Sequence, residues 1–166
     1  MCYKLIEMSC LNLEYIPKHL QTQQMCLNAF KSHCSSIVYM KDEFKTPDMC
    51  LLATKHYPYC IEYVPKELQI PEICLDVVKK DGILLKHIEK QSSEICLEAV
   101  KQNGLALKYA KFKTLELCKM AVRQNRGILD YMEECLGMYF VNDGLMSDDV
   151  LISLYYNDYT KRKCYL

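Results

Sequence analysis

Six cysteines recur along the chain at nearly constant intervals, and this regularity limits the fold more than any other feature. The intervals are 24 residues and then 22 residues, at Cys2, Cys26, Cys50, Cys74, Cys96 and Cys118. Eleven positions after each cysteine stands a leucine or isoleucine, and thirteen positions after all but one stands a tyrosine. Self-similarity at a period of roughly 20 to 50 residues is the signature of a repeat architecture. The chain is therefore predicted to be an array of about six similar units.

Each unit is predicted to contain a helix, a turn and a second, shorter helix. In the fifth unit, the apolar residues of the first helix share one face: Cys96, Leu97, Ala99 and Val100. The second helix of that unit is expected near 105–111, about two turns long, with Leu107 and Ala110 facing inward. Helices of about ten residues are marginal alone in water, so the units must stack. The predicted fold is an all-α solenoid of about six two-helix repeats of 22–24 residues.

Capping residues mark the expected ends of the first helices. Thr46 and the following Pro47 supply an N-cap and a first-turn proline, and Ser92 and Thr114 stand at the equivalent place in later units. Gly82 and Gly104 stand where a left-handed residue would close the helix. The proposed units are 1–24, 25–48, 49–72, 73–94, 95–116 and 117–136. Residues 137–166 are predicted to form a connection and a C-terminal capping helix over about 145–162.

The composition narrows the class of protein. Of the 166 residues, 51% are hydrophobic, and the 21 basic residues balance the 21 acidic ones. A neutral chain is a poor non-specific ligand for nucleic acid, which is held by a basic surface. No apolar run of about 18 residues is present, so no membrane span or membrane partner is expected. With no visible signal segment, the chain is expected in a reducing cytoplasm, where its eleven cysteines would be free thiols.

The cysteine ladder, meaning the six regularly spaced cysteines, has a structural and a chemical interpretation. Cysteine packs as a small hydrophobe, and neighbouring ladder positions should lie roughly 9–10 Å apart, too far for a disulfide. A metal centre would need convergent ligands at short spacings, and no C-x-x-C or H-x-x-x-H is present. The four histidines fall in different units and the glycines are isolated. We therefore expect no metal, no cofactor, no catalytic residues and no enzyme activity.

Two columns of residues could form a binding surface. The basic column recurs five residues after the ladder cysteines, at Lys31, Lys55, Lys79, Lys101 and Arg123. Two interpretations stand: the column would suit RNA or an acidic partner, or it would only face solvent near the negative ends of the helix dipoles. The tyrosine column comprises Tyr15, Tyr39, Tyr63, Tyr109 and Tyr131, with His87 in the fourth unit. It could bind a partner, or fill the gaps between units with its hydroxyls bonded to neighbouring loops.

Units such as Glu94–Ala110 (EICLEAVKQNGLALKYA) resemble a short helical repeat of unknown function. That repeat family is abundant in giant viruses of amoebae and also occurs in some bacteria and protists. The resemblance covers about 1–136, is best over 73–136, and loses the glycine at Cys34 and Pro58. It implies a helical array and, with 18 lysines and 13 tyrosines, an origin in a giant virus. It implies no activity, because the family is defined by a repeat.

The function predicted from the sequence is a non-catalytic protein–protein interaction module or adaptor. Its partner would be a host or viral protein, bound by exposed aromatic and arginine side chains. The candidates beyond the basic column are Phe44, Tyr57, Tyr59 and Arg126. Nucleic-acid binding through the basic column is one alternative. Self-assembly is another, because Leu5 and Ile6 of the uncovered first unit could pair in a homodimer.

Overall fold

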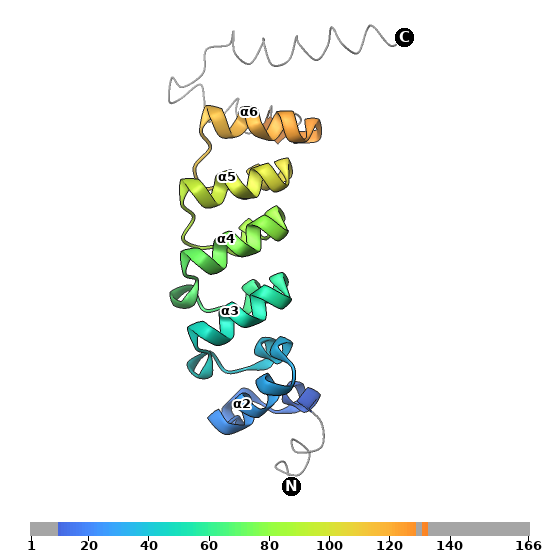
Figure 1. Ribbon diagram of the computed structural model, residues 1–166, viewed down its shortest axis with the longest axis vertical. Coiled ribbons are helices and arrows are strands. Elements are labelled where there is room, and N and C mark those ends of the chain that lie inside the picture. The colour runs from blue at the N-terminus through green and yellow to red at the C-terminus, as the bar shows by residue number, and fades with distance from the viewer. Residues whose placement is uncertain (1–9, 129–130, 133–166) are drawn as a thin grey trace, which may run out of the picture.

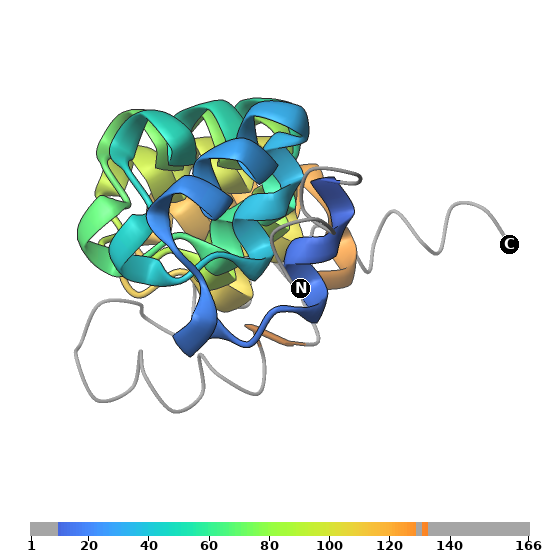
Figure 2. The same ribbon diagram turned by 90° about the horizontal axis from the view of Figure 1, so that it is seen from below.

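The computed structural model describes residues 10–128, 131 and 132, and these residues form an elongated stack of helices without strands (Figure 1). Ten-residue α-helices recur along the stack: α2 (Gln23–Ser32), α3 (Pro47–His56), α4 (Pro71–Lys80), α5 (Ser93–Gln102) and α6 (Leu115–Gln124). The helices α3 to α6 lie side by side, and successive units project onto one another along the stack (Figure 2). The all-α repeat fold is confirmed. The predicted capping helix lies outside the described residues.

A short 3₁₀-helix, rather than a second α-helix, follows each α-helix. These helices are η3 (Cys34–Tyr39), η5 (Pro58–Tyr63), η7 (Gly82–His87), η8 (Gly104–Tyr109) and η9 (Arg126–Ile128), with η1 (Cys10–Tyr15) before α2. Six residues make two turns of 3₁₀-helix, and this type is common in short segments. Asp81 and Asn103 begin two of them by accepting the N–H group two residues further on, at 3.0 Å in both cases. The predicted length of the second helix, about two turns, agrees with the structure, whereas its 3₁₀ type was not predicted.

The α-helices begin where the sequence places their caps. The hydroxyl groups of Thr46, Ser92 and Thr114 accept the N–H group three residues further on, at 3.2–3.3 Å. Thr22 does the same for α2, while α4 has no side-chain cap and begins directly at Pro71. Such caps occupy N–H groups that have no partner within the helix, so local sequence fixes these starts.

The prediction that Gly82 and Gly104 close helices in the left-handed conformation is wrong. Neither glycine has a φ in the left-handed region, and each instead begins the following 3₁₀-helix. A Cβ atom at Gly82 would lie 2.2 Å from the carbonyl oxygen of Ala99, which belongs to the next unit. At Gly104 the corresponding oxygen, that of Ala121, would lie at 2.5 Å. Glycine is therefore required because the backbones of adjacent units approach closely.

The two repeat lengths have a structural cause. In the units with 24-residue spacing an extra 3₁₀ turn precedes the next α-helix: η2 (Lys18–Leu20), η4 (Asp42–Phe44) and η6 (Lys66–Leu68). The connections of the 22-residue units, 88–92 and 110–114, contain no such turn. The change in cysteine spacing therefore marks a change in how one unit is joined to the next.

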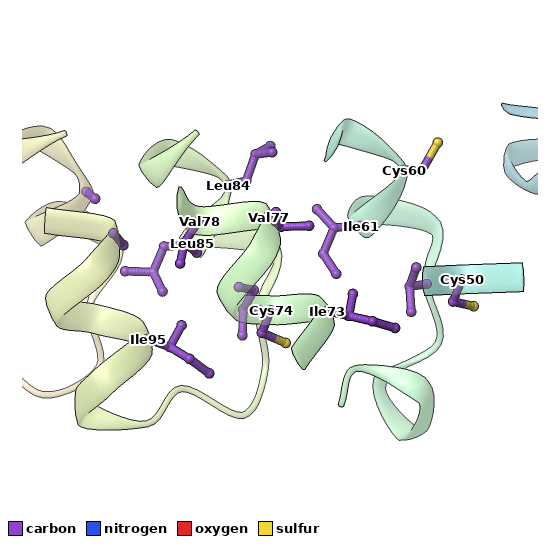
Figure 3. Packing of buried hydrophobic residues seen from close by; sticks show 14 of the residues in the cluster. Cys50, Cys60, Ile61, Ile73, Cys74, Val77, Val78, Leu84, Leu85 and Ile95 are labelled. Carbon is purple, nitrogen blue, oxygen red and sulfur yellow. The ribbon is translucent and has the colours of Figure 1, made fainter. Parts of the chain in front are cut away.

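The core is one continuous layer between the α-helices and the 3₁₀-helices. Its centre is the cysteine ladder, of which Cys26, Cys50, Cys74, Cys96 and Cys118 are no more than 1% exposed. Side chains from successive units meet between them, as Ile61 of η5 and Val77 of α4 do in Figure 3. Leu107 and Ala110 are buried and Lys108 is exposed, as predicted. The ladder cysteines therefore pack as small apolar residues at the helix contacts.

Candidate interaction surfaces

A column of polar side chains, three of them buried, fixes one unit to the next, and the sequence analysis missed it. The linker column stands five residues before each ladder cysteine, at Gln21, Lys45, Gln69, Gln91 and Lys113. Gln69 shows its geometry: its amide donates to the carbonyl oxygens of Val64 at 3.4 Å and His87 at 3.0 Å. Its carbonyl oxygen accepts the N–H group of Glu89 at 3.0 Å. One side chain thus joins the ends of two successive 3₁₀-helices.

The linker column also holds the backbone of the tyrosine column. Gln21 donates to the carbonyl oxygen of Tyr39 at 2.8 Å, and Gln91 to that of Tyr109 at 3.0 Å. Lys45, which is buried, reaches the carbonyl oxygen of Tyr63 at 2.6 Å. Because these polar groups are enclosed and paired, they serve the fold rather than a ligand. They fix the backbone at Tyr39, Tyr63 and Tyr109, and so place these three aromatic side chains in the same way.

The tyrosine side chains themselves are open to solvent. Tyr39, Tyr63 and Tyr109 are 37–41% exposed and Tyr15 is 78% exposed. None of these four hydroxyl groups has a partner among the described residues, whereas the hydroxyl of Tyr131 lies 3.4 Å from the carbonyl oxygen of Lys108. Tyr39, Tyr63 and Tyr109 are more than half covered, as the packing alternative predicts, but the hydroxyl bond to a neighbouring unit is present only at Tyr131. The other members form an exposed aromatic stripe on the 3₁₀-helix side.

The basic column lies on the opposite surface, at the C-terminal ends of the α-helices. All five members are exposed. Lys101 pairs with Glu98 at 2.7 Å, and the side chains of Lys31, Lys55, Lys79 and Arg123 have no ion-pair partner within the described residues. The helices α3 to α6 run in the same direction, so their negative dipole ends lie along this edge and favour cations there. The structure therefore brings Lys55, Lys79, Lys101 and Arg123 into one line, whereas Lys31 lies on α2, which makes almost no direct contact with α3.

A shallow depression of about 280 Å³ opens on this line between α5 and α6. Its lining residues are Lys101, Met120, Arg123 and Gln124. The amide of Gln124 also donates to the carbonyl oxygen of Gln102 at 3.2 Å and accepts the N–H group of Gly104 at 2.6 Å, so one wall is fixed. Two cations beside an apolar thioether make a site that suits an anionic side chain with an apolar stem.

Acidic residues form a second column on the same surface. They stand two residues before the ladder cysteines, at Asp48, Glu72, Glu94 and Glu116, and all are exposed. Seven residues separate each from the basic residue of its own helix, which is about 10 Å at 1.5 Å per residue. Like the basic column, these carboxylates suit the dipole of the helix end they occupy. The surface therefore has one acidic and one basic edge.

The aromatic residues predicted as anchors do not form one patch. Tyr57 and Tyr59 are 51% and 66% exposed beside the C-terminal end of α3, close in sequence to Lys55, and the hydroxyl of Tyr59 lies 3.2 Å from Asp81. Phe44 lies before the N-terminal end of α3, whereas the two tyrosines follow its C-terminal end. The ten residues of α3 separate these two ends by about 15 Å. Phe44 is half-buried against the core with Lys41 5.6 Å from its ring centre. The side chain of Arg126 lies outside the described residues.

The buried thiols are less acidic than ordinary cysteine side chains. Burial raises the pKa of Cys50, Cys74 and Cys118 to about 11, and that of Cys60 to the same value. A thiol is a nucleophile or a metal ligand only as the thiolate, which these residues do not form at neutral pH. Among the described residues, no three histidine, cysteine, aspartate or glutamate side chains are grouped as a metal site requires.

These features define an all-α repeat protein made of stacked two-helix units. The model of a protein family described as a domain of unknown function, DUF4116, matches three stretches of the chain: 22–69, 71–115 and 92–136. The chain belongs to this family of repeats. No curated protein and no solved structure matches it. In the part of the chain that the structure describes, no helix combines the length and the hydropathy needed to cross a membrane.

Proposed function

We propose that the protein is a non-catalytic interaction module that binds another protein through its tyrosine column. The observation that carries this proposal is the exposure of Tyr15, Tyr39, Tyr63 and Tyr109, whose hydroxyls have no partner in the described residues. Tyrosine is enriched in protein interfaces because it offers a large apolar area and one polar tip at little entropic cost. A column of such side chains on a rigid array is a ready recognition surface.

The rigidity of the column supports the proposal. The carbonyl groups of Tyr39, Tyr63 and Tyr109 are each bonded to a linker-column side chain of the preceding unit. A surface that is ordered before binding loses less entropy when the partner arrives. The proposal includes an origin in a giant virus and action in the host cytoplasm, with a host or viral protein as partner. The lysine-rich and tyrosine-rich composition supports that part.

Nucleic-acid binding through the basic column is the second candidate. It is favoured by the exposure of Lys31, Lys55 and Lys79, which have no ion-pair partner among the described residues. Binding of this kind would weaken steeply with salt, because each neutralised phosphate releases counterions. Self-assembly through Leu5 and Ile6 concerns residues outside the described part, and a homodimer stays a prediction that the mass of the particle in solution would test.

The test is affinity capture of the tagged chain from infected or native cells, with and without nuclease. A triple variant, Tyr39→Ser, Tyr63→Ser and Tyr109→Ser, is compared with Lys86→Gln, Lys90→Gln and Glu62→Gln, which also change three exposed side chains. We expect one protein to be recovered near stoichiometry with the wild-type chain and the control, but not with the tyrosine variant. Equal recovery by both variants would remove the tyrosine column as the binding surface. Loss of recovery on nuclease treatment would favour nucleic acid.

A further inference from the structure

We propose that the basic column binds an acidic polypeptide segment in an extended conformation, with one carboxylate for each unit of the array. This second surface lies on the α-helix side, away from the tyrosine column, and would make the protein an adaptor with two binding faces. The inference rests on the proposed protein-binding function, because it names the chemistry of one partner. It depends on three properties of the column: free charge, spacing and an anchoring depression.

The charges of the column are available to a ligand. Lys31, Lys55, Lys79 and Arg123 are exposed and have no ion-pair partner within the described residues. By contrast, the neighbouring Lys80 is bonded to Asp76 at 2.5 Å and to the carbonyl oxygen of Lys55 at 2.8 Å. The structure thus divides the lysines of this edge into Lys80, which joins units, and the column lysines, of which only Lys101 is in an ion pair within the described residues.

The spacing of the column matches an extended peptide. Packed helices lie about 8–10 Å apart, so α3 to α6 present one cation at about that interval. A polyproline II segment advances 3.1 Å per residue with three residues per turn, so every third side chain points the same way about 9.3 Å further on. Carboxylates at every third position of such a segment would therefore meet successive cations without bending either partner.

The depression between α5 and α6 supplies an anchor. Arg123 has a planar fork of donors that can hold a carboxylate through two parallel hydrogen bonds, and Lys101 adds a second positive charge. Met120 lines the same hollow and offers a flexible apolar contact for the methylene groups of a glutamate side chain. One acidic side chain of the ligand is thus expected to bind here more strongly than the others.

Nearby carboxylates favour a polypeptide over nucleic acid. Asp76 and Glu98 lie within the basic line, and Glu98 is held against Lys101 at 2.7 Å. A nucleic-acid strand carries a phosphate at every nucleotide, at about 3.4 Å intervals along a duplex, and would meet these acids repeatedly. A peptide with one acid in three residues avoids them.

The test uses the full chain and a fluorescent peptide of five Glu-Pro-Pro repeats, which spans about 46 Å as polyproline II. A control peptide has the same composition with its glutamates contiguous. Binding is followed by fluorescence anisotropy at low salt. We expect the spaced peptide to bind more tightly than the contiguous one. The double variant Lys79→Gln, Arg123→Gln should weaken binding about fivefold to tenfold, as expected for the loss of two surface ion pairs.

The matched control is Lys86→Gln, Lys90→Gln, which removes the same charge from exposed residues outside the column. Equal weakening by both double variants would overturn the inference, because the attraction would then be only the net charge. Equal binding of the two peptides would overturn the spacing argument. A labelled oligouridylate that binds more tightly than the spaced peptide and loses affinity in the column variant would assign the column to RNA. If the spaced peptide does not bind while a protein is still captured through the tyrosine column, this inference is wrong and the proposed function is still supported.

Discussion

The two well-matched stretches of the chain, 22–69 and 71–115, stack their units in different ways. In 71–115 the glycines Gly82 and Gly104 let the following α-helix approach the backbone directly. In 22–69 the equivalent positions are Cys34 and Pro58, and an extra 3₁₀ turn lengthens each connection. In that stretch α2 and α3 make almost no direct contact, whereas α4 and α5 pack on each other directly. A repeat fold can thus keep its core while changing the joint between units.

Proline and lysine occur together at two joints, one within the first stretch and one between the two stretches. Gln21, Gln69 and Gln91 each accept the N–H group of the residue twenty positions later, at 2.9–3.0 Å. Counting twenty from Lys45 leads to Pro65, which has no N–H group. The same exchange occurs at a second position. Gln102 of α5 accepts the N–H group of Gly82 in the preceding unit. One unit earlier, Lys80 takes the place of Gln102 and Pro58 takes the place of Gly82. At these two joints a donor-only lysine replaces glutamine and a proline replaces the backbone donor.

Alkaline pH should cause the largest change in the free energy of unfolding. Buried thiols are present in both stretches, so the same titration compares them. The thiols of Cys50, Cys74 and Cys118 have a pKa of about 11 in the folded chain, because burial disfavours the thiolate. A group with a raised folded pKa contributes stability below its unfolded pKa, and this is lost as pH rises toward the folded value. The free energy of unfolding should therefore fall between about pH 9 and 11, by several kcal/mol in sum.

The measurement is urea unfolding followed by circular dichroism from pH 7 to 11, with pulsed alkylation of thiols in parallel. Cys74→Ala should reduce the pH dependence, since one buried thiol is removed. Each ladder cysteine reports the opening of its own unit, and we expect Cys26 and Cys50 to be alkylated before Cys74 and Cys96. A stability that is flat up to pH 11 would contradict the burial argument, and the reverse labelling order would overturn the contrast between stretches.

Gly82→Ala should be the most damaging single change at a joint. The new Cβ would meet the backbone oxygen of Ala99, which cannot move without shifting α5. We expect a loss of about 2–3 kcal/mol in the free energy of unfolding, the range for overpacking a rigid contact. Cys34→Ala is the matched control in the other stretch, where a side chain is already accommodated, and should cost less than about 1 kcal/mol. Similar losses at both positions in urea titrations would show that the joints are alike.

Much of this fold could be predicted because its signals are local. The period of the cysteines, the caps at Thr46, Ser92 and Thr114, and the inward side of Leu107 can all be identified within one unit. The role of Gly82 could not, because the atom that excludes a Cβ belongs to Ala99 of the next unit. A glycine after a helix then suggests the commoner left-handed cap, and this prediction was wrong.

The candidate surfaces also include features that local sequence predicts and features that it does not. The exposure of the basic column follows from its position on the helix, seven residues after the acidic column, and was foreseen as a solvent-facing line. The linker column was missed because glutamine in a loop usually faces water. Its signal was present, since Gln21, Gln69 and Gln91 all stand five residues before a ladder cysteine. The separation of Phe44 from Tyr57 depends on the whole length of α3, which intervenes between them.

Lys45→Gln tests the pairing of lysine with proline and should have a moderate effect. Lys45 is buried and donates to the carbonyl oxygen of Tyr63, and glutamine could keep that bond. The amide oxygen of the new glutamine would have no donor, because Pro65 stands where the other units provide an N–H group. We expect a loss of about 1–2 kcal/mol, the cost of a buried unsatisfied acceptor. Adding Pro65→Ala should recover most of it, and additive losses in the double-mutant cycle would contradict the pairing.

Ser36→Ala should have the smallest effect, and the opposite sign. The hydroxyl of Ser36 is buried in η3 with no hydrogen-bond partner, at the position where later units have Cys60, Leu84 and Ala106. Removing an unsatisfied buried hydroxyl should raise the free energy of unfolding by up to about 1 kcal/mol in urea titrations. Thr54→Val is the matched control, because the hydroxyl of Thr54 is bonded to the carbonyl oxygen of Cys50 at 2.8 Å. If Ser36→Ala instead destabilises the chain, the hydroxyl must have a hydrogen-bond partner within the first stretch. The contrast in packing between the two stretches would then weaken.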